Sequence, residues 1–312
     1  MGQRQGPGRH HLNPQTTPEA FEAYEAVRHR LPPVRRRGAC AAAADLDAIA
    51  DRFDVLLLDA FGVLNIGETA IAGVPDRIAR LQAAGKRVLV VTNAAGYPHS
   101  SLMAKYARLG YDFAPEDVIS SRLTLLDALT SMPATDFGLM ATQSLGHADL
   151  DHLDFTYLAE DPAPYEAASA FLLLGSAAWS ETRQTLLQDA LRRDPRPVLV
   201  GNPDIVAPRE AGFSVEPGNY AHRLADATGV SPAFFGKPFH NIYDLALARL
   251  GAGYARDRIL MVGDSLHTDI LGGQSAGVQT ALIAGYGFFA AHNTAPFITA
   301  SGIEPDFILE RP

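Results

Sequence analysis

At 312 residues the chain has room for about two domains of ~150 residues each, and 47% hydrophobic with 20% charged residues is typical of a globular protein. The formal charge of −9 is uneven, because residues 1–44 carry seven Arg, no Lys and three Glu, which leaves a strongly acidic body. An acidic body argues against nucleic acid as a partner, and no run approaches the ~20 apolar residues of a membrane-spanning helix.

The cysteine count and the N-terminal residues bear on the cellular compartment. Cys40 is the single cysteine, which excludes an internal disulfide framework and fits a reducing compartment. Residues 1–18 lack an apolar signal core and are rich in Gly, Pro, His and Gln, so a disordered lead-in is predicted. We therefore expect a cytoplasmic protein, with the basic segment 34–38 as a solvated tail.

From residue 18 onward the pattern predicts helices and then an alternation of strands and helices. Apolar spacing predicts a helix over 18–31 and a short one over 44–53. Further along, strands are expected at 55–59, 87–93 and 117–121, and helices at 73–85 and 98–110. Continuous apolar strands alternating with helices indicate a doubly wound parallel sheet, in an α/β fold of Rossmann-like type.

A second group of strands interrupts this sheet. Strands are predicted at 136–142, 170–175 and 197–204, with a helix at 181–193. The first sheet is then expected to resume with strands at 233–238, 258–264, 278–285 and 306–309 and helices at 240–251 and 268–277. The sequence thus predicts an N-terminal extension (1–50), a Rossmann-like core (51–132 and 229–312) and an inserted α/β domain (133–228).

Polar residues follow the predicted core strands. Ligands of such sheets bind beyond the carboxyl ends of the strands, which gathers Asp59, Thr92, Asn93 and Asp264 at one crevice. A carboxylate there can attack phosphorus as a covalent nucleophile. Because a carboxylate and a phosphate repel each other, a bridging Mg²⁺ with oxygen ligands would suit Asp59 and Asp264. Capping aspartates and strand-end turn residues remain the alternative interpretation.

Lys237 is singled out by composition. The chain has only three lysines, against 23 arginines, and this one lies between Gly236 and Pro238. In a chain so biased towards Arg, the choice of Lys indicates that a compact ammonium is needed there. Such an ammonium could neutralise charge that develops on a transferred group. A stray surface lysine is the alternative.

Five stretches in order carry a resemblance to a known family. They are LLLDAFGVLN (56–65), VLVVTNAAG (88–96), VGNPD (200–204), FFGKP (234–238) and MVGDSLHTDILGGQSAG (261–277). Together they resemble the haloacid dehalogenase (HAD) superfamily, whose members are mostly magnesium-dependent phosphatases. The closest resemblance is to its class IIA, in which an α/β cap is inserted between the second and third motifs. The family's p-nitrophenylphosphatases and sugar phosphatases are of this type.

The resemblance implies a HAD-like core, a cap over 133–228 and a metal site. Asp59 would be the nucleophile, and Mg²⁺ would be held by Asp59, by Asp264 and by the backbone carbonyl of Phe61. Asp269 would not bind the metal directly but would orient the groups that do.

The resemblance also assigns residues to the substrate, which it implies is a small phosphorylated metabolite. Thr92 and Lys237 would bind the phosphoryl group during catalysis, and Asn93 would add to its cradle. In the cap, Asn202 and Asp204 would contact the leaving group, with a simple turn as the alternative. Nearby histidines are expected to be structural: His99, His240 and His267. Cap-mediated dimers occur in the family, which leaves a homodimer open.

Phe61 departs from the family pattern. Typical members carry a second Asp there, which protonates the leaving oxygen and then activates water, and phenylalanine can do neither. Because general acid–base catalysis is worth ~10²–10⁴-fold, we expect good leaving groups such as nitrophenolate to be favoured. Two alternatives stay open: a phosphate-ligand sensor with negligible turnover, and a 2-haloacid dehalogenase, which carries an aromatic residue here and uses no metal. The GDSLHTD signature weighs against the dehalogenase.

Overall fold

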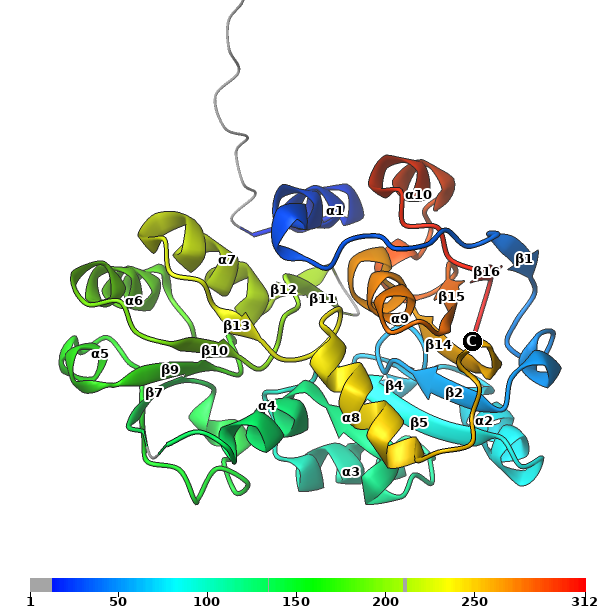
Figure 1. Cartoon of the computed structure of the whole chain (residues 1–312), viewed down its shortest axis with the longest axis horizontal. Helices are drawn as coiled ribbons and strands as arrows, with labels where there is room; N and C mark the ends of the chain where they lie inside the picture. Colours follow the sequence, from blue (N-terminus) through cyan, green and yellow to red (C-terminus); the bar gives the residue numbers. More distant parts are fainter. Residues whose placement is uncertain (1–12, 134, 210–211) are drawn as a thin grey trace, which may run out of the picture.

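Two parallel β-sheets organise the chain (Figure 1). The computed structural model describes residues 13–133, 135–209 and 212–312, so most of the predicted lead-in lies outside the described residues. In spatial order the first sheet consists of β1 (Ala41–Ala43), β16 (Phe307–Leu309), β15 (Gln279–Ile283), β14 (Ile259–Gly263), β2 (Val55–Leu58), β5 (Arg87–Thr92) and β6 (Val118–Ser120). All its pairings are parallel, which confirms the predicted α/β, Rossmann-like architecture.

Helices cover both faces of the first sheet. They are α2 (Val74–Ala83) and α3 (His99–Arg108) on one face, and α8 (His240–Leu250) and α9 (Leu271–Ser275) on the other. Successive side chains of a strand point to opposite faces. Thus Leu56 and Leu58 of β2 pack towards α2 and α3, whereas Val55 and Leu57 pack towards α8. Because both faces are covered, β2 is an unbroken apolar run, as predicted.

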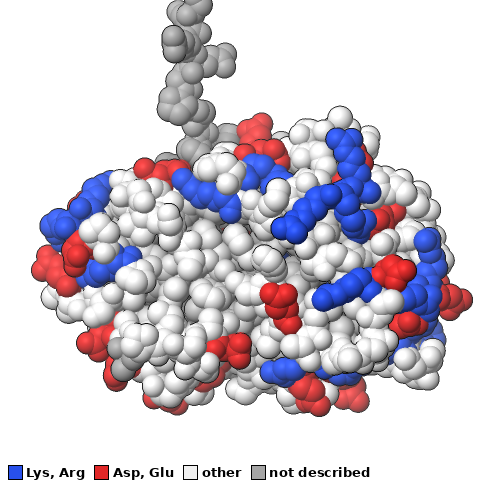
Figure 2. Space-filling view, in the orientation of Figure 1, with Lys and Arg blue, Asp and Glu red and all other residues white. Residues whose placement is uncertain are grey.

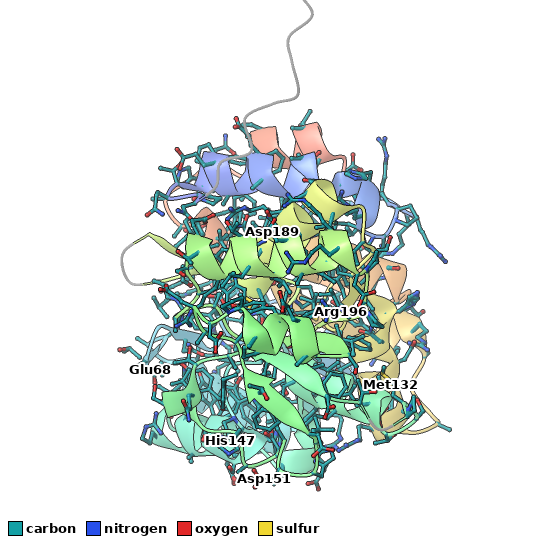
Figure 3. All side chains as sticks on the ribbon, turned by 90° about the vertical axis from the view of Figure 1, so that its left-hand side faces the viewer. Glu68, Met132, His147, Asp151, Asp189 and Arg196 are labelled. Carbon is teal, nitrogen blue, oxygen red and sulfur yellow. The ribbon has the colours of Figure 1, made fainter. Side chains whose placement is uncertain are left out.

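The second sheet is also wholly parallel, and it forms the left-hand part of Figure 1. Its strands, in order, are β13 (Ala233–Phe234), β10 (Val198–Val200), β9 (Ala170–Leu173), β7 (Phe137–Met140) and β8 (Phe155–Tyr157). One face packs on α6 (Glu181–Arg193) and α7 (Pro217–Thr228), close to α5 (Ala163–Ala167), and the other packs on α4 (Ser121–Leu129). Figure 3 looks onto this part, with Asp189 on α6 and His147 at the lower end.

The strand predicted at 233–238 was placed in the wrong sheet. Ala233 and Phe234 form β13, which pairs with Leu199 and Val200 of β10 instead of joining the first sheet. The reason is that α7 returns the chain to the open edge of the second sheet. A two-residue strand has no periodicity from which its partner could be read.

Two antiparallel hairpins and one helix lie outside the two sheets and the helices that cover them. They are β3 (Asn65–Ile66) with β4 (Thr69–Ala70), β11 (Val206–Pro208) with β12 (Phe213–Val215), and α10 (Ala295–Ser301). The sequence prediction did not include either hairpin. Each strand has only two or three residues, which is too short for an alternating pattern to be recognised.

The predicted N-terminal helix is present and bridges the two parts of the molecule. It is α1 (Thr17–Ala26), which begins at a capping box of Thr16 and Glu19 and crosses the top of the molecule in Figures 1 and 3. Its buried face, which includes Phe21 and Tyr24, packs in one cluster with Ile205 from beside the second sheet and Phe288 from beside the first.

The remainder of the extension is more ordered than predicted. Arg36 donates to both oxygens of Asp306 and to the carbonyl of Val278, each at 2.6 Å, so a wholly solvated basic tail was the wrong expectation. β1 follows at the edge of the first sheet, and the helix predicted over 44–53 is a single 3₁₀ turn, Ala50–Arg52. Pairing across 270 residues cannot be read from local sequence.

Charges of both signs are interspersed on the face shown in Figure 2. Among the described residues, Arg258 and Asp54 form an exposed ion pair at 2.6 Å. Among the described residues, no helix has the length and apolarity needed to cross a bilayer.

The packing of α1 generates a prediction about stability. The Phe21 ring lies 5.0 Å from that of Phe297 and 5.2 Å from that of His267, centroid to centroid. Replacing Phe21 by Ala should lower the free energy of unfolding by about 3 kcal/mol, because it leaves a cavity. Urea denaturation measures this change, with the exposed Ala26→Ser as the control. A loss below about 1 kcal/mol would contradict this packing.

Candidate active site

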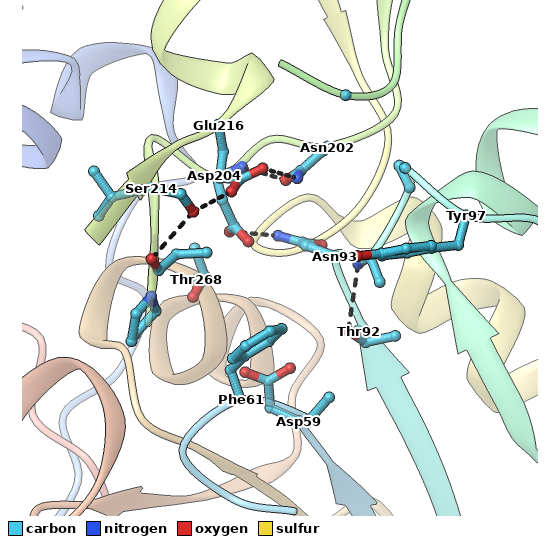
Figure 4. Close-up of a pocket in the computed structure, with 18 of the residues that line it drawn as sticks. Asp59, Phe61, Thr92, Asn93, Tyr97, Asn202, Asp204, Ser214, Glu216 and Thr268 are labelled. Carbon is cyan, nitrogen blue, oxygen red and sulfur yellow. Dashed lines mark hydrogen bonds between the residues drawn. The ribbon is translucent and has the colours of Figure 1, made fainter. Parts of the chain in front are cut away.

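A cavity of about 180 Å³ lies between the two sheets, at the carboxyl ends of the first-sheet strands. Asp59 follows β2, Thr92 ends β5 and Asp264 follows β14, so adjacent parallel strands deliver these residues to one edge. Eight of the nine predicted site residues line the cavity: Asp59, Phe61, Thr92, Asn93, Asn202, Asp204, Lys237 and Asp264. Figure 4 shows Asp59 and Phe61 on one side and Asp204, Asn202 and Glu216 on the other.

The ninth residue, Asp269, lies behind the cavity and shares the ammonium of Lys237. Lys237 Nζ lies 2.6 Å from Asp59 Oδ1 and 2.7 Å from Asp269 Oδ1. The second oxygen of Asp269 accepts the backbone N–H of Ser265 at 3.0 Å. Lys237 is 2% exposed. Both carboxylates raise the pKa of Lys237, although burial lowers it, so the ammonium stays charged.

Asp264 is packed closely between two glycines. Its Oδ2 accepts the backbone N–H of Phe288 at 2.8 Å. Gly62 and Gly287 have φ values of +72° and +68°, and a Cβ on either would overlap the Asp264 carboxylate. The glycine after Phe61 therefore serves two needs: a left-handed backbone, and close approach of the loop to Asp264.

The three carboxylates form an oxygen-rich cluster suited to a divalent cation. One oxygen from each of Asp59, Asp264 and Asp269 lies within 4.8 Å of the others. Burial raises the pKa of Asp59 to about 7, against the lowering effect of Lys237, and raises that of Asp264 well above its usual value. One ammonium among three buried carboxylates leaves an excess of negative charge, which a hard dication such as Mg²⁺ would offset.

Asn93 ties the two parts of the site together. Its Nδ2 donates to Asp204 Oδ1 at 2.8 Å and to the carbonyl of Lys237 at 2.9 Å, while its Oδ1 accepts the Lys237 N–H at 2.8 Å. A Cβ on Gly236 would overlap Asn93 Oδ1, which explains the glycine before Lys237. Next to Asn93, the Thr92 hydroxyl accepts the N–H of Ala94 at 3.3 Å, and a hydroxyl can donate as well as accept.

Asn202 lies at the cavity wall with both ends of its amide engaged. Its Nδ2 donates to Glu216 Oε2 at 3.1 Å, and its Oδ1 accepts the N–H of Asp204 at 3.0 Å. Glu216 Oε1 in turn accepts the Ser214 hydroxyl at 2.5 Å and Arg209 Nη2 at 2.9 Å. This network fixes the loop that carries Asp204.

Phe61 is flanked by two cations. Lys105 Nζ lies 5.2 Å from the centre of its ring, and the Arg209 guanidinium lies 5.3 Å from it. These are cation–π distances. The ring thus packs between Lys105 and Arg209, which follows β11.

Sequence reasoning missed the part of the wall that α1 and the β11–β12 hairpin supply. The Tyr24 hydroxyl accepts the N–H of Ile205 at 3.1 Å, and its ring stacks on His267 at 5.0 Å. His267 Nε2 lies 2.6 Å from Glu25 Oε1, which agrees with the structural role expected of this histidine. Helical spacing indicated that α1 has a buried face but not what that face covers.

Comparison with known proteins gives consistent matches. Residues 56–155 match the haloacid dehalogenase-like hydrolase family model, and residues 234–311 match an HAD-hydrolase-like model. Glycerol-3-phosphate phosphatase of Gallus gallus is 29% identical over 286 residues, which cover 84% of this chain and 91% of the relative.

Solved structures share the fold. A possible sugar phosphatase from Cytophaga hutchinsonii superposes with a TM-score of 0.75 at 24% identity, covering 87% of this chain and 98% of that chain. A glycerol phosphate phosphatase from Mycobacterium tuberculosis, solved in complex with magnesium, superposes with a TM-score of 0.65 at 25% identity, covering 83% of this chain and 76% of that one.

The packing around Asp264 generates a prediction about metal binding. Gly62→Ala should weaken Mg²⁺ binding, measured as the Mg²⁺-induced rise in melting temperature, because the new methyl group displaces Asp264. Gly85→Ala is the matched control, since Gly85 has φ +83° with no atom within 4 Å of its added Cβ. Both variants carry a left-handed strain of about 1–2 kcal/mol. Equal Mg²⁺ responses would contradict the placement of the metal beside Asp264.

Proposed function

This chain belongs to the haloacid dehalogenase superfamily of hydrolases. We propose that it is a class IIA phosphatase that removes the phosphoryl group from small metabolites that are phosphate monoesters. The observation that carries the proposal is the Asp59–Lys237–Asp269 arrangement beside Asp264. It combines a strand-end carboxylate nucleophile with a charge-neutralising ammonium. The region that contains β7 to β10 is the proposed cap over this site.

Each proposed role is assigned to a specific atom. Asp59 attacks phosphorus through a carboxylate oxygen to form an aspartyl phosphate, which splits one displacement into two easier ones. Lys237 Nζ, held at 2.6 Å from Asp59, also lies where it can stabilise charge on the phosphoryl oxygens. The Thr92 hydroxyl, whose oxygen already accepts the N–H of Ala94, directs its proton to a phosphoryl oxygen.

The proposed cofactor is Mg²⁺, held by Asp59, Asp264 and the Phe61 carbonyl, with Asp269 orienting its surroundings. When bound, the ion neutralises charge between Asp59 and the phosphoryl group. The relative that was solved with magnesium supports this assignment. Asp269 serves indirectly, because its oxygens are already engaged with Lys237 and the Ser265 N–H.

The alternatives fit the site less well. A 2-haloacid dehalogenase uses no metal and would have no need for three converging buried carboxylates. A phosphate-binding sensor would share the fold and the metal site, and Phe61 is the feature in its favour. The two are separated by turnover: a sensor is stabilised by phosphate and Mg²⁺ without releasing product, whereas a phosphatase releases it.

A metabolite screen for phosphate release tests the proposed function. With Mg²⁺ present, we expect release from at least one small phosphate ester, and chelation should abolish it. Asp59→Asn should lower the rate by ~10³-fold or more, because an amide cannot act as the nucleophile. Activity that persists in Asp59→Asn, or that is indifferent to chelation, would refute the proposal.

A further inference from the structure

Phe61 leaves the proposed reaction without a group for proton transfer. A leaving alkoxide needs a proton, and the water that cleaves the aspartyl phosphate must lose one. Among the described residues, four carboxylates line the cavity: Asp59, Asp204, Glu216 and Asp264. Asp59 is the nucleophile and Asp264 belongs to the metal site, which leaves two candidates.

Glu216 is fully engaged. Its carboxylate accepts hydrogen bonds from Ser214, Arg209 and Asn202, at 2.5, 2.9 and 3.1 Å. Three donors, one of them a guanidinium, therefore occupy both of its oxygens, and Glu216 serves to fix the loop.

Asp204 is in the opposite situation. Among the residues that the structure describes, one donor reaches its carboxylate, Asn93 Nδ2 at 2.8 Å on Oδ1. Figure 4 shows Asp204 on the wall of the cavity opposite Asp59, beside Asn93. Asn93 also bonds the backbone of Lys237 through both ends of its amide, so the position of Asp204 is coupled to the ammonium that contacts Asp59.

The charged and titratable groups around Asp204 favour its protonated form. Burial is the largest cause that raises the pKa of Asp204; Lys237 and the Asn93 hydrogen bond lower it, the negative charges of Asp59 and Glu216 raise it, and together these effects place the pKa at about 8. Tyr24 of α1 also faces it, and burial together with Asp204 raises the pKa of that phenol, so Tyr24 stays neutral. At neutral pH Asp204 therefore holds a proton that it can donate, and it can act as a base once the proton has left.

We propose that Asp204, supplied by the cap, is the general acid and base that replaces the carboxylate missing at Phe61; this rests on the proposed phosphatase function. In the first step an Asp59 oxygen bonds to phosphorus, the phosphorus–oxygen ester bond breaks, and the Asp204 proton goes to the leaving oxygen. In the second step water bonds to phosphorus and gives a proton to the Asp204 carboxylate. The bond from phosphorus to Asp59 then breaks, releasing phosphate and restoring both residues.

Single-turnover kinetics on the full-length, Mg²⁺-loaded protein test this role. Asp204→Asn keeps the size of the side chain and its acceptor for Asn93. For glycerol 3-phosphate, leaving-group release should slow by ~10²-fold or more, because an alkoxide needs the proton. For 4-nitrophenyl phosphate the first equivalent of nitrophenolate should appear within ten-fold of the wild-type rate, followed by a slow phase, because the second step lacks its base.

Glu216→Gln is the matched control, because it alters the other carboxylate of the same wall, which is fully hydrogen-bonded. Its effect on release should be of similar size for both substrates. If Asp204→Asn slows release by the same factor for both substrates, or slows release for neither substrate, Asp204 is not the proton donor. A wild-type protein that is inactive on every ester would instead contradict the proposed phosphatase function.

A second measurement tests whether Asp204 is protonated, and it does not depend on enzymatic activity. A carboxyl whose pKa is higher in the folded than in the unfolded state loses folded-state stability as pH rises between the two values. The urea midpoint of Asp204→Asn should therefore rise relative to wild type from about pH 4 to about pH 8 and level off above that. A difference that stays constant from pH 5 to pH 8 would show that Asp204 is already ionised and would overturn the inference.

Discussion

The ammonium of Lys237, buried between Asp59 and Asp269, is the interaction on which the rest of the site depends. A buried charge is tolerated only when it is paired and hydrogen-bonded, and removal of one partner leaves the other uncompensated. The surroundings satisfy this requirement closely. Asn93 fixes the Lys237 backbone, and the Ser265 N–H fixes the second oxygen of Asp269. The strand ends and loops are thus arranged around one cation, beside three carboxylates whose oxygens converge.

The residue that fixes the Lys237 backbone, Asn93, also links the two parts of the molecule. Asn93, which bonds the Lys237 backbone, also bonds Asp204 from the opposite wall of the cavity. On the outer side, α1 adds a second connection: Tyr24 accepts the Ile205 N–H and stacks on His267, which follows β14. Any opening of the cavity along this wall must break these contacts. Access of a substrate and the stability of the packed state are therefore coupled through a few polar contacts and the buried face of α1.

The sequence predicted those site residues whose position depends on the residue type and on the pattern of its neighbours along the chain. Asp59, Thr92 and Asp264 could be placed at one edge because a run of apolar residues ending in a polar one identifies a buried parallel strand and its carboxyl end. Lys237 was identified because lysine is so scarce in this chain. The reason for glycine at positions 62 and 236 is visible only in the structure, where Gly62 lies close to Asp264 and Gly236 lies close to Asn93.

What the sequence could not supply are pairings between distant segments. The Arg36–Asp306 pair spans 270 residues, and β13 pairs with β10 through two residues. Neither leaves a local periodic signal. The same holds for Tyr24, whose position at the cavity depends on where α1 docks. Asp204 was identified as a contact to the leaving group, but its environment, from which we infer proton transfer, is created by burial and by Asn93 across the cavity.

In the proposed reaction Asp59 forms a covalent bond to phosphorus. Rapid acid quench of the Mg²⁺-loaded protein during turnover, followed by borohydride reduction of the acyl phosphate and peptide mass spectrometry, tests it directly. Residue 59 should be converted to homoserine, and the conversion should be absent without substrate. Conversion at another residue, or phosphate release with no acyl phosphate on the chain, would contradict it.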